Sequence, residues 1–310
     1  MKFAMTAINQ ISIMFLIMMI GAFCYRLNLI DRDMNKKLSN LVLLLVNPLI
    51  IFASYQREFK SSLLSGLLVS FILALAAHVI GILISLIVLR GRKNRDYLPL
   101  ERFAVIYSNC GFIGIPLVNG VLGSEGVFYL TSYMTAFNIF AWTHGVMTIS
   151  GKRDRRFVLA AFTSPAIIAT IAGLVFFAFG IILPDVPLKT ITNIGDMNTP
   201  LAMLVAGATI AQSDIRKLFS KARVYYISFI KLLLNPLLLM FLFRLFRISD
   251  IVYITVIIAC ACPTGASINL FSIRYDKDYI YASKLFAVTT ILSILTIPLI
   301  ILCANILIAR

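Results

Sequence analysis

The sequence predicts an all-α integral membrane protein, with ten transmembrane helices arranged as two inverted repeats of five. Three observations lead to this fold class: an apolar composition, ten apolar runs, and two interruptions of those runs at matching places in the two halves. Hydrophobic residues make up 60% of the chain and charged residues 13%, whereas soluble domains have about 45–50% and about 25%. A soluble fold would need a core far larger than 310 residues can enclose.

Each of the ten apolar runs can cross a membrane, with some allowance at its ends, because about 20 residues of helix span a hydrocarbon core of about 30 Å. No soluble domain is expected between them, since the longest connection lies at about 183–196. The first run is interpreted as a span and not as a signal peptide, because it is long and lacks a small-residue cleavage site. The predicted spans are 6–25, 38–55, 63–89, 103–122, 125–149, 157–182, 197–213, 224–246, 250–273 and 279–308.

Lysine and arginine residues concentrate in every second connection. The connections after odd-numbered spans contain 19 of them, whereas the other connections and the two termini together contain 7. Cytoplasmic loops of membrane proteins carry the excess of Lys and Arg, so we expect a multi-pass protein of the plasma membrane with both termini outside the cytoplasm. This distribution explains the net charge of +15 without nucleic acid, which would require a basic face with groove-reading or stacking elements.

Helix-breaking residues interrupt the fourth and the ninth of these runs. Glycine and proline occur in 108–120 and in 260–269, and both residue types interrupt the hydrogen-bond ladder of a helix. Freed backbone groups at membrane depth survive only where they are buried in protein or line a wet cavity. A matched pair of such segments points to the binding site of a transporter, and we expect the two broken helices to cross there.

The two halves of the chain, 1–150 and 151–310, are predicted to be repeats. An offset of 152 residues places Pro48 on Pro200 and Cys110 on Cys262. Each half contains five spans, and this odd number makes the second half enter the membrane in the opposite orientation. The sequence therefore predicts an inverted repeat.

Four stretches, 109–116, 200–208, 263–266 and 289–298, carry a resemblance to a known family, and the Asn-x-Gly-x-x-Gly-x-Pro pattern of the first is the most specific. The chain resembles, over essentially its whole length, the auxin efflux carrier family of plant PIN-FORMED auxin exporters and bacterial permeases for malate, malonate or related acids. This resemblance implies a ten-helix fold shared with bile-acid sodium symporters. It also implies a scaffold of spans 1, 2, 6 and 7, a moving transport unit of spans 3–5 and 8–10, and a homodimer formed through the scaffold. The long hydrophilic loop after span five of many plant members is absent here.

The chemistry of the two interruptions favours an anion. Where a helix restarts after a break, its free N–H groups and positive dipole end attract negative charge, and proline suits the first turn of such a restart. Asparagine amides and Ser or Thr hydroxyls can donate to a carboxylate, and the resemblance implies that Asn109 contacts the substrate carboxylate. These polar groups could instead serve only the broken backbone. The candidate site residues are Asn109, Gly111, Gly114, Pro116, Pro263, Thr264, Gly265, Ser267 and Asn269.

Two lysines, Lys231 and Lys284, and the two histidines, His78 and His144, lie inside predicted spans. An unpaired cation at membrane depth is costly, so either lysine could be a counter-ion for a dicarboxylate or could extend to the membrane interface. Either histidine could carry a proton or be a hydrogen-bonded structural residue. No carboxylate occupies the middle of a span, which disfavours cation antiport. Sodium held by backbone and hydroxyl oxygens, proton coupling, and driving by the membrane potential alone remain alternatives.

Catalytic and metal-binding patterns are not recognisable in the sequence, and we expect neither an enzyme nor a bound cofactor. All five cysteines fall in predicted spans, where disulfides are not expected. Cys260 and Cys262 point to different sides of a regular helix and have no neighbouring histidine, so a metal site is not predicted. Cys110 and Cys262 are interpreted as small residues that allow close packing at the crossing.

Together these features predict a secondary transporter that moves a small organic anion by an elevator-type, alternating-access mechanism. The anion would be a mono- or dicarboxylate such as malate or malonate, or an auxin-like acid, and the partners would be this substrate and the lipid bilayer. One alternative is a sodium-coupled symporter of larger amphipathic acids, resembling the bile-acid branch. Another is a membrane sensor that binds a ligand without transporting it, although such sensors usually carry a cytosolic signalling domain, which is not recognisable here.

Overall fold

The computed structural model describes residues 2–90, 96–151, 163–212 and 221–308, and over these residues the chain is helical. The integral-membrane prediction is confirmed, because six helical stretches of the described chain are long and apolar enough to cross a bilayer. They are Met5–Arg26, Arg32–Ser54, Ser61–Val88, Cys110–Ser150, Ala222–Arg244 and Tyr279–Ile308. The apolar helices Pro165–Ala178 and Asp250–Ala261 are shorter, so the count of ten spans stays a prediction.

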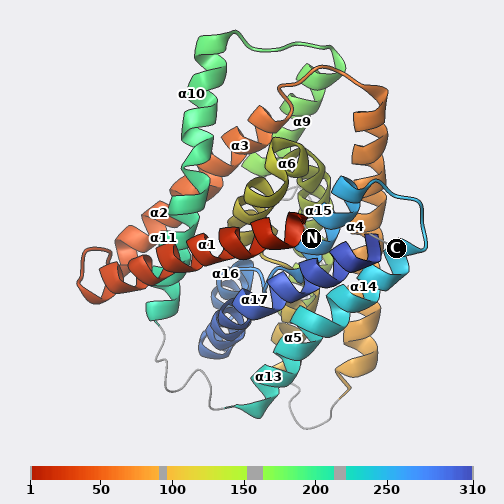
Figure 1. The fold of residues 1–310 in the computed structure, drawn as a ribbon. Helices are drawn as coiled ribbons and strands as arrows, with labels where there is room; N and C mark the ends of the chain where they lie inside the picture. The colour runs from red at the N-terminus through yellow and green to blue at the C-terminus, as the bar shows by residue number, and fades with distance from the viewer. Residues whose placement is uncertain (1, 91–95, 152–162, 213–220, 309–310) are drawn as a thin grey trace.

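The first part of the chain contains the helices of the first three predicted spans (Figure 1). The second of these begins at Arg32, earlier than predicted, because the Asp31 side chain accepts a hydrogen bond of 2.7 Å from the Met34 N–H and caps the helix. The elements are α1 (Lys2–Arg26), α2 (Arg32–Leu41), the π-turn η1 (Val42–Val46), α3 (Asn47–Ser54) and α4 (Ser61–Val88).

The middle of the chain contains the first interruption and the longest helical stretch. Gly123 lies inside this stretch with φ 68° and ψ −162°, a conformation that favours glycine. The predicted boundary between the fourth and fifth spans therefore coincides with a backbone kink. The elements are α5 (Leu98–Ile106), the π-turn η2 (Cys110–Gly114), α6 (Ile115–Phe140), the π-turn η3 (Ala141–Gly145) and α7 (Val146–Ser150).

The connection predicted at residues 183–196 is largely helical. Pro184 precedes the helix and Asp185 lies in its first turn, where a negative charge interacts favourably with the helix dipole. The elements are α9 (Pro165–Ala178), α10 (Asp185–Asp196), α11 (Asn198–Ala211), α13 (Ala222–Phe229), the π-turn η4 (Ile230–Leu234), α14 (Asn235–Arg244), α15 (Asp250–Ala261), α16 (Ser267–Arg274) and α17 (Tyr279–Ile308).

Three of the π-turns have a common cause in the sequence. The turns η1, η2 and η4 each end two residues before a proline, namely Pro48, Pro116 and Pro236. Proline lacks an N–H and its ring clashes with the carbonyl four residues earlier, and a locally wider π-turn accommodates both effects. The prolines therefore change the direction in which the preceding side chains point without ending the helix.

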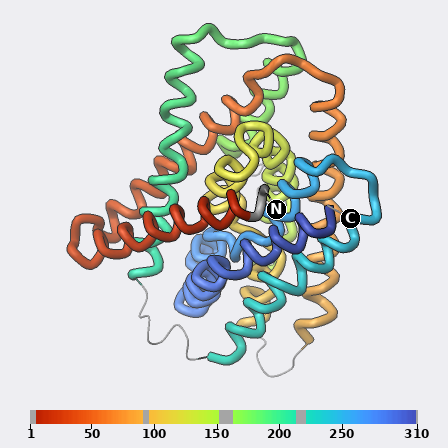
Figure 2. The backbone as a smooth tube through the Cα atoms, viewed as in Figure 1, coloured from red at the N-terminus to blue at the C-terminus, as the bar shows by residue number. Residues whose placement is uncertain are grey.

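Helices α1 and α11 cross in unusually close contact, and glycines make this possible. An added Cβ at Gly207 would overlap the carbonyl oxygen of Met18, and one at Gly21 would overlap that of Leu204. Such backbone approach is typical of membrane helices that pack through small residues. The smooth backbone trace in Figure 2 shows α1 running across α11 and beside α17.

At the centre of the molecule, α6 packs against α4 and α15, and buried side chains from all three belong to the same apolar core.

A polar cluster fixes α5 to two neighbouring helices. The Arg223 guanidinium of α13 donates to both carboxylate oxygens of Glu101, at 3.0 and 2.7 Å, and the Tyr281 hydroxyl of α17 donates to one of them at 2.9 Å. Glu101 is buried, and such a carboxylate is tolerated because it is paired and hydrogen-bonded.

Candidate functional site

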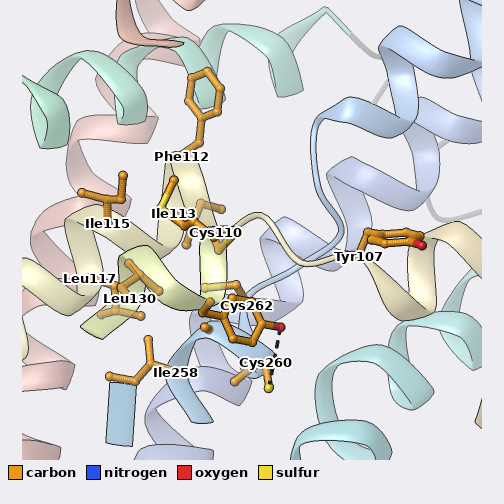
Figure 3. Packing of buried hydrophobic residues seen from close by; sticks show 14 of the residues in the cluster. Tyr107, Cys110, Phe112, Ile113, Ile115, Leu117, Leu130, Ile258, Cys260 and Cys262 are labelled. Carbon is orange, nitrogen blue, oxygen red and sulfur yellow. Dashed lines mark hydrogen bonds between the residues drawn. The ribbon is translucent and has the colours of Figure 1, made fainter. Parts of the chain in front are cut away.

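The two interruptions meet backbone to backbone. Ser108 and Thr264 form an isolated antiparallel bridge, in which the Asn109 N–H donates to the Pro263 carbonyl at 2.7 Å and the Gly265 N–H donates to the Tyr107 carbonyl at 2.9 Å. Figure 3 shows the two connecting segments passing beside each other near Cys110 and Cys262. The breaks predicted from glycine and proline are therefore real, and each satisfies backbone groups that the other leaves free.

Each break also caps the helix that ends at the other break. The Ser108 hydroxyl donates to the carbonyl of Cys260, in the last turn of α15, at 3.4 Å. The Thr264 hydroxyl donates to the carbonyl of Ala104, in the last turn of α5, at 3.1 Å. The last carbonyls of a helix lack partners within the helix, so these two hydroxyls stabilise the ends of α5 and α15. Thr264, a predicted site residue, thus serves the backbone here, and its N–H donates to the Thr289 hydroxyl at 3.2 Å.

Asn109 is positioned differently, because one of its polar atoms has no partner. It caps the helical segment that restarts at Cys110: its Oδ1 accepts a hydrogen bond of 3.4 Å from the Phe112 N–H. The side chain is 5% exposed, and its amide nitrogen, Nδ2, is buried without a hydrogen-bond partner. The Ser267 hydroxyl at the start of α16 is likewise buried without a partner. Buried polar groups are normally hydrogen-bonded, so each restart has a donor that remains available to an acceptor.

The two predicted prolines do not lie where the sequence suggested. Helical structure resumes at Cys110 as the π-turn η2, so Pro116 lies in the first turn of α6 but six residues after the restart itself. Pro263 belongs to the second break, and the helix after it begins at Ser267. The first interruption ends where Asn109 caps the new helical segment. The second ends after the bridge residue Thr264, where α16 begins at Ser267.

The predicted glycines lie at the crossing, where an added Cβ would meet neighbouring atoms at about contact distance. A Cβ at Gly265 would lie 3.4 Å from the Ser108 carbonyl oxygen, and one at Gly114 would lie 3.6 Å from the Cys262 Sγ. A Cβ at Gly111 would lie 3.5 Å from the amide nitrogen of Asn47. Asn269, in contrast, accepts a hydrogen bond from the Ser283 hydroxyl at 3.3 Å, so its side chain is already engaged with α17.

Lys231 is fully buried at the crossing. Its side chain is 0% exposed, and its Nζ donates a hydrogen bond of 2.6 Å to the Ser108 hydroxyl. The alternative that this lysine extends to the membrane interface is therefore wrong. Lys284, six residues into α17, is half-buried.

Both histidines lie beside the first break. The His144 Nδ1 is 2.8 Å from the Tyr107 hydroxyl, and the His78 Nδ1 is 2.7 Å from the carbonyl of Ala74 one turn earlier in α4. His78 is buried and its Nε2 has no hydrogen-bond partner. His144 is thus held by a residue of the break, whereas His78 packs among aromatic rings, including that of Tyr133 at 5.2 Å.

Sequence reasoning missed Ser108 and a buried asparagine pair. Ser108 links Lys231 to the end of α15, and its place directly before Asn109 was the available signal. The Asn198 amide donates to the Asn47 side-chain oxygen, and both residues are buried. Their separation of 151 residues nearly equals the offset of the predicted repeat, which was the available signal for this pair.

An apolar crevice opens between α1, α17 and the helix that follows the first break. It is small, with a cavity volume of about 20 Å³, and the hydroxyl-bearing residues of its lining, Thr290 and Ser293, both belong to α17. Both hydroxyls bond to carbonyls of their own helix, which leaves the crevice apolar. It is lined by Ile11, Met14, Phe15, Met18, Ile113, Leu117, Thr290, Ser293, Ile294 and Ile297.

The described residues hold no group of three or more His, Cys, Asp or Glu side chains arranged to bind a metal ion. The five cysteines are free thiols, and Figure 3 shows Cys110 close to Cys262. The short distance between these side chains agrees with the interpretation that they allow close packing.

Comparison with known proteins places this geometry in a family. The model of a family described as membrane transport protein matches residues 6–301. An uncharacterized transporter of Methanothermobacter thermautotrophicus is 23% identical over 286 residues, which cover 91% of this chain and 93% of the relative. The uncharacterized transporter MJ1031 of Methanocaldococcus jannaschii is 23% identical over 305 residues, which cover 95% of this chain and 98% of the relative. The chain therefore belongs to the membrane transport protein family, the auxin efflux carrier-like group that its two interrupted helices resemble.

Proposed function

We propose that this member of the family is a secondary transporter of a small organic anion, a mono- or dicarboxylate such as malate or malonate, or an auxin-like acid. The observation that carries the proposal is the buried, unpartnered Nδ2 of Asn109 at the start of a helical segment. The Ser267 hydroxyl offers a second free donor at the other restart. Two donors and two helix N-termini at one crossing form an environment that favours negative charge.

We further propose an elevator-type movement on a ten-helix, inverted-repeat architecture. In this arrangement α1, α2 with α3, α9, and α10 with α11 form the scaffold, and the remaining helices move with the crossing. The apolar lining of the crevice between α1 and the helix after the first break supports this division, because apolar surfaces can slide without breaking polar contacts. The Gln10 side chain, which donates to the Pro116 carbonyl at 3.2 Å, would have to release its partner during the movement.

The crevice also favours a second candidate, a symporter of larger amphipathic acids. An apolar wall beside a carboxylate-binding crossing would suit a substrate with a hydrophobic body. The substrate size thus separates the two candidates: small carboxylates for the first, bulky amphipathic acids for the second.

Flux into proteoliposomes tests the proposed function. Purified protein is reconstituted, and uptake of radiolabelled malonate, malate, indole-3-acetate and a bile acid is followed with an imposed membrane potential. We expect saturable accumulation of at least one small carboxylate, which protein-free liposomes do not show. Accumulation of the bile acid alone would favour the second candidate, and saturable binding without flux would identify a sensor.

We also propose that both termini face away from the cytoplasm of a plasma-membrane protein, as the distribution of positive charge indicates. Single cysteines introduced at Arg92 and Arg153, which lie outside the described residues, test this on a background without native cysteines. We expect an impermeant maleimide to label both positions only after the cells are opened. Labelling of both positions from outside intact cells would reverse the orientation.

A further inference from the structure

We propose that the Lys231 ammonium is a resident cation of the crossing, taking the place of a bound coupling metal ion, so that anion transport by this chain does not require sodium. The proposal rests on the proposed function and adds its coupling mode. This role differs from that of a counter-ion, which would pair with the second charge of a dicarboxylate. A resident cation interacts with the protein itself, whether the substrate carries one negative charge or two.

The sequence explains why this lysine points into the protein. Lys231 lies in the π-turn η4, which precedes Pro236, and the wider turn rotates the side chains before it relative to a regular helix. The turn packs against α5, α15 and α17, the helices that lead into and support the crossing. A lysine at this place cannot reach water along the helix surface, and its side chain is 0% exposed.

The groups around the ammonium are oxygen and sulfur atoms and not carboxylates. Nζ donates to the Ser108 hydroxyl at 2.6 Å, and this hydroxyl donates to the Cys260 carbonyl at 3.4 Å. The thiols of Cys110, Cys260 and Cys262 lie within its electrostatic reach, and so does His78 on α4. Within the described part of the chain, no carboxylate forms an ion pair with Lys231.

Helix dipoles supply the negative potential that a buried ammonium needs. Helix α5 ends at Ile106 and α15 ends at Ala261, so two C-terminal ends reach the crossing. Each carries about half a negative elementary charge. Together they offset a single positive charge, and the opposite dipole ends, at Cys110 and Ser267, remain available for an anion.

The same surroundings would otherwise suit a hard metal cation. Sodium binds carbonyl and hydroxyl oxygens, and the hydroxyl of Ser108 and the carbonyls at the end of α15 are such ligands. An ammonium uses the same oxygens as hydrogen-bond acceptors. Two cations cannot share this buried volume, because like charges a few ångströms apart repel strongly at low dielectric constant. Lys231 therefore excludes a metal ion from this position.

Thermal unfolding tests this without any substrate. In Lys231→Ala, the vacated space exposes the Ser108 hydroxyl and the helix ends to small cations. In potassium-free choline buffer, we expect ethylammonium or sodium to raise the Tm of Lys231→Ala by on the order of 5 °C. The Tm of the wild type and of Lys284→Ala, the matched intramembrane lysine control, should not change. A sodium-specific rise in the wild-type Tm, or a Lys231→Ala protein that responds to no small cation, would overturn the proposal.

Flux measurements provide a second test with variants that keep the side-chain volume. We expect wild-type uptake to be equal in sodium and choline media, Lys231→Arg to retain transport, and Lys231→Met to lose on the order of 10-fold or more for mono- and dicarboxylates alike. A loss confined to dicarboxylates would show a counter-ion, and a wild type that stops without sodium would show a separate coupling ion. If the wild type moves no carboxylate at all, the proposed function fails, while the thermal experiment still decides the role of Lys231.

Discussion

Replacing Asn109 with alanine is expected to raise the apparent KM for the carboxylate about 10- to 150-fold, or to abolish flux. The free Nδ2 of this residue is buried at the start of a helical segment, where it can donate to an anion. A hydrogen bond to a charged group contributes roughly 1.5–3 kcal/mol, which corresponds to that range of affinity. Initial uptake rates over a range of substrate concentrations measure the change.

The alanine variant alone would not separate binding from folding, because the Asn109 Oδ1 also caps the helix by accepting from the Phe112 N–H. Loss of an N-cap costs about 0.5–2 kcal/mol of stability. Asn109→Asp retains the cap acceptor, removes the donor and adds negative charge. We therefore expect Asn109→Asp to unfold at nearly the wild-type Tm and yet to transport no anion.

Asn269→Ala is the matched control, because Asn269 lies near the other restart but already accepts a hydrogen bond from Ser283. We expect it to affect KM much less than Asn109→Ala does. Normal transport by Asn109→Asp would show that the asparagine serves only the helix end, and the carboxylate site would then have to be sought elsewhere.

The sequence was most informative where local chemistry decides the structure. Glycine and proline in two apolar runs were sufficient to locate both interruptions, because they disrupt helical hydrogen bonding wherever they occur. The boundary predicted between the fourth and fifth spans coincides with the kink at Gly123, although the kink itself was not predicted. The family resemblance then indicated Asn109, whose free amide nitrogen fits the expected role.

Features that depend on contacts between distant residues were not predictable. The sequence left open whether Lys231 is buried, because its depth depends on how η4 packs against α5, α15 and α17. The role of Thr264 as a cap for α5 depends on the Ala104 carbonyl, 160 residues away. Pro116 and Pro263 were assigned to helix restarts because proline suits a first turn, but the bridge between the breaks determines where helices resume.

The second large effect is expected from Gly207→Ala, which should prevent α1 and α11 from packing as they do. An added Cβ would overlap the Met18 carbonyl oxygen and crowd the Ala22 nitrogen, and these backbone atoms can move only if the two helices separate. Overpacking of this kind costs about 1–3 kcal/mol and occasionally more. We expect the upper end, because rigid backbone and not a flexible side chain is displaced.

Gly81→Ala is the matched control for this substitution. Gly81 also lies inside a membrane helix, but its added Cβ would meet the Asn235 amide nitrogen at 3.6 Å and Ile106 atoms at 3.8 Å, which are ordinary contacts. Alanine also has the higher helix propensity, so Gly81→Ala should match or slightly exceed the wild-type Tm. Gly207→Ala should unfold roughly 6–12 °C lower, at about 2–4 °C per kcal/mol, and give less monodisperse protein on size exclusion. Equal Tm values for the two variants would mean that α1 and α11 are not packed closely enough at Gly207 to exclude a Cβ atom.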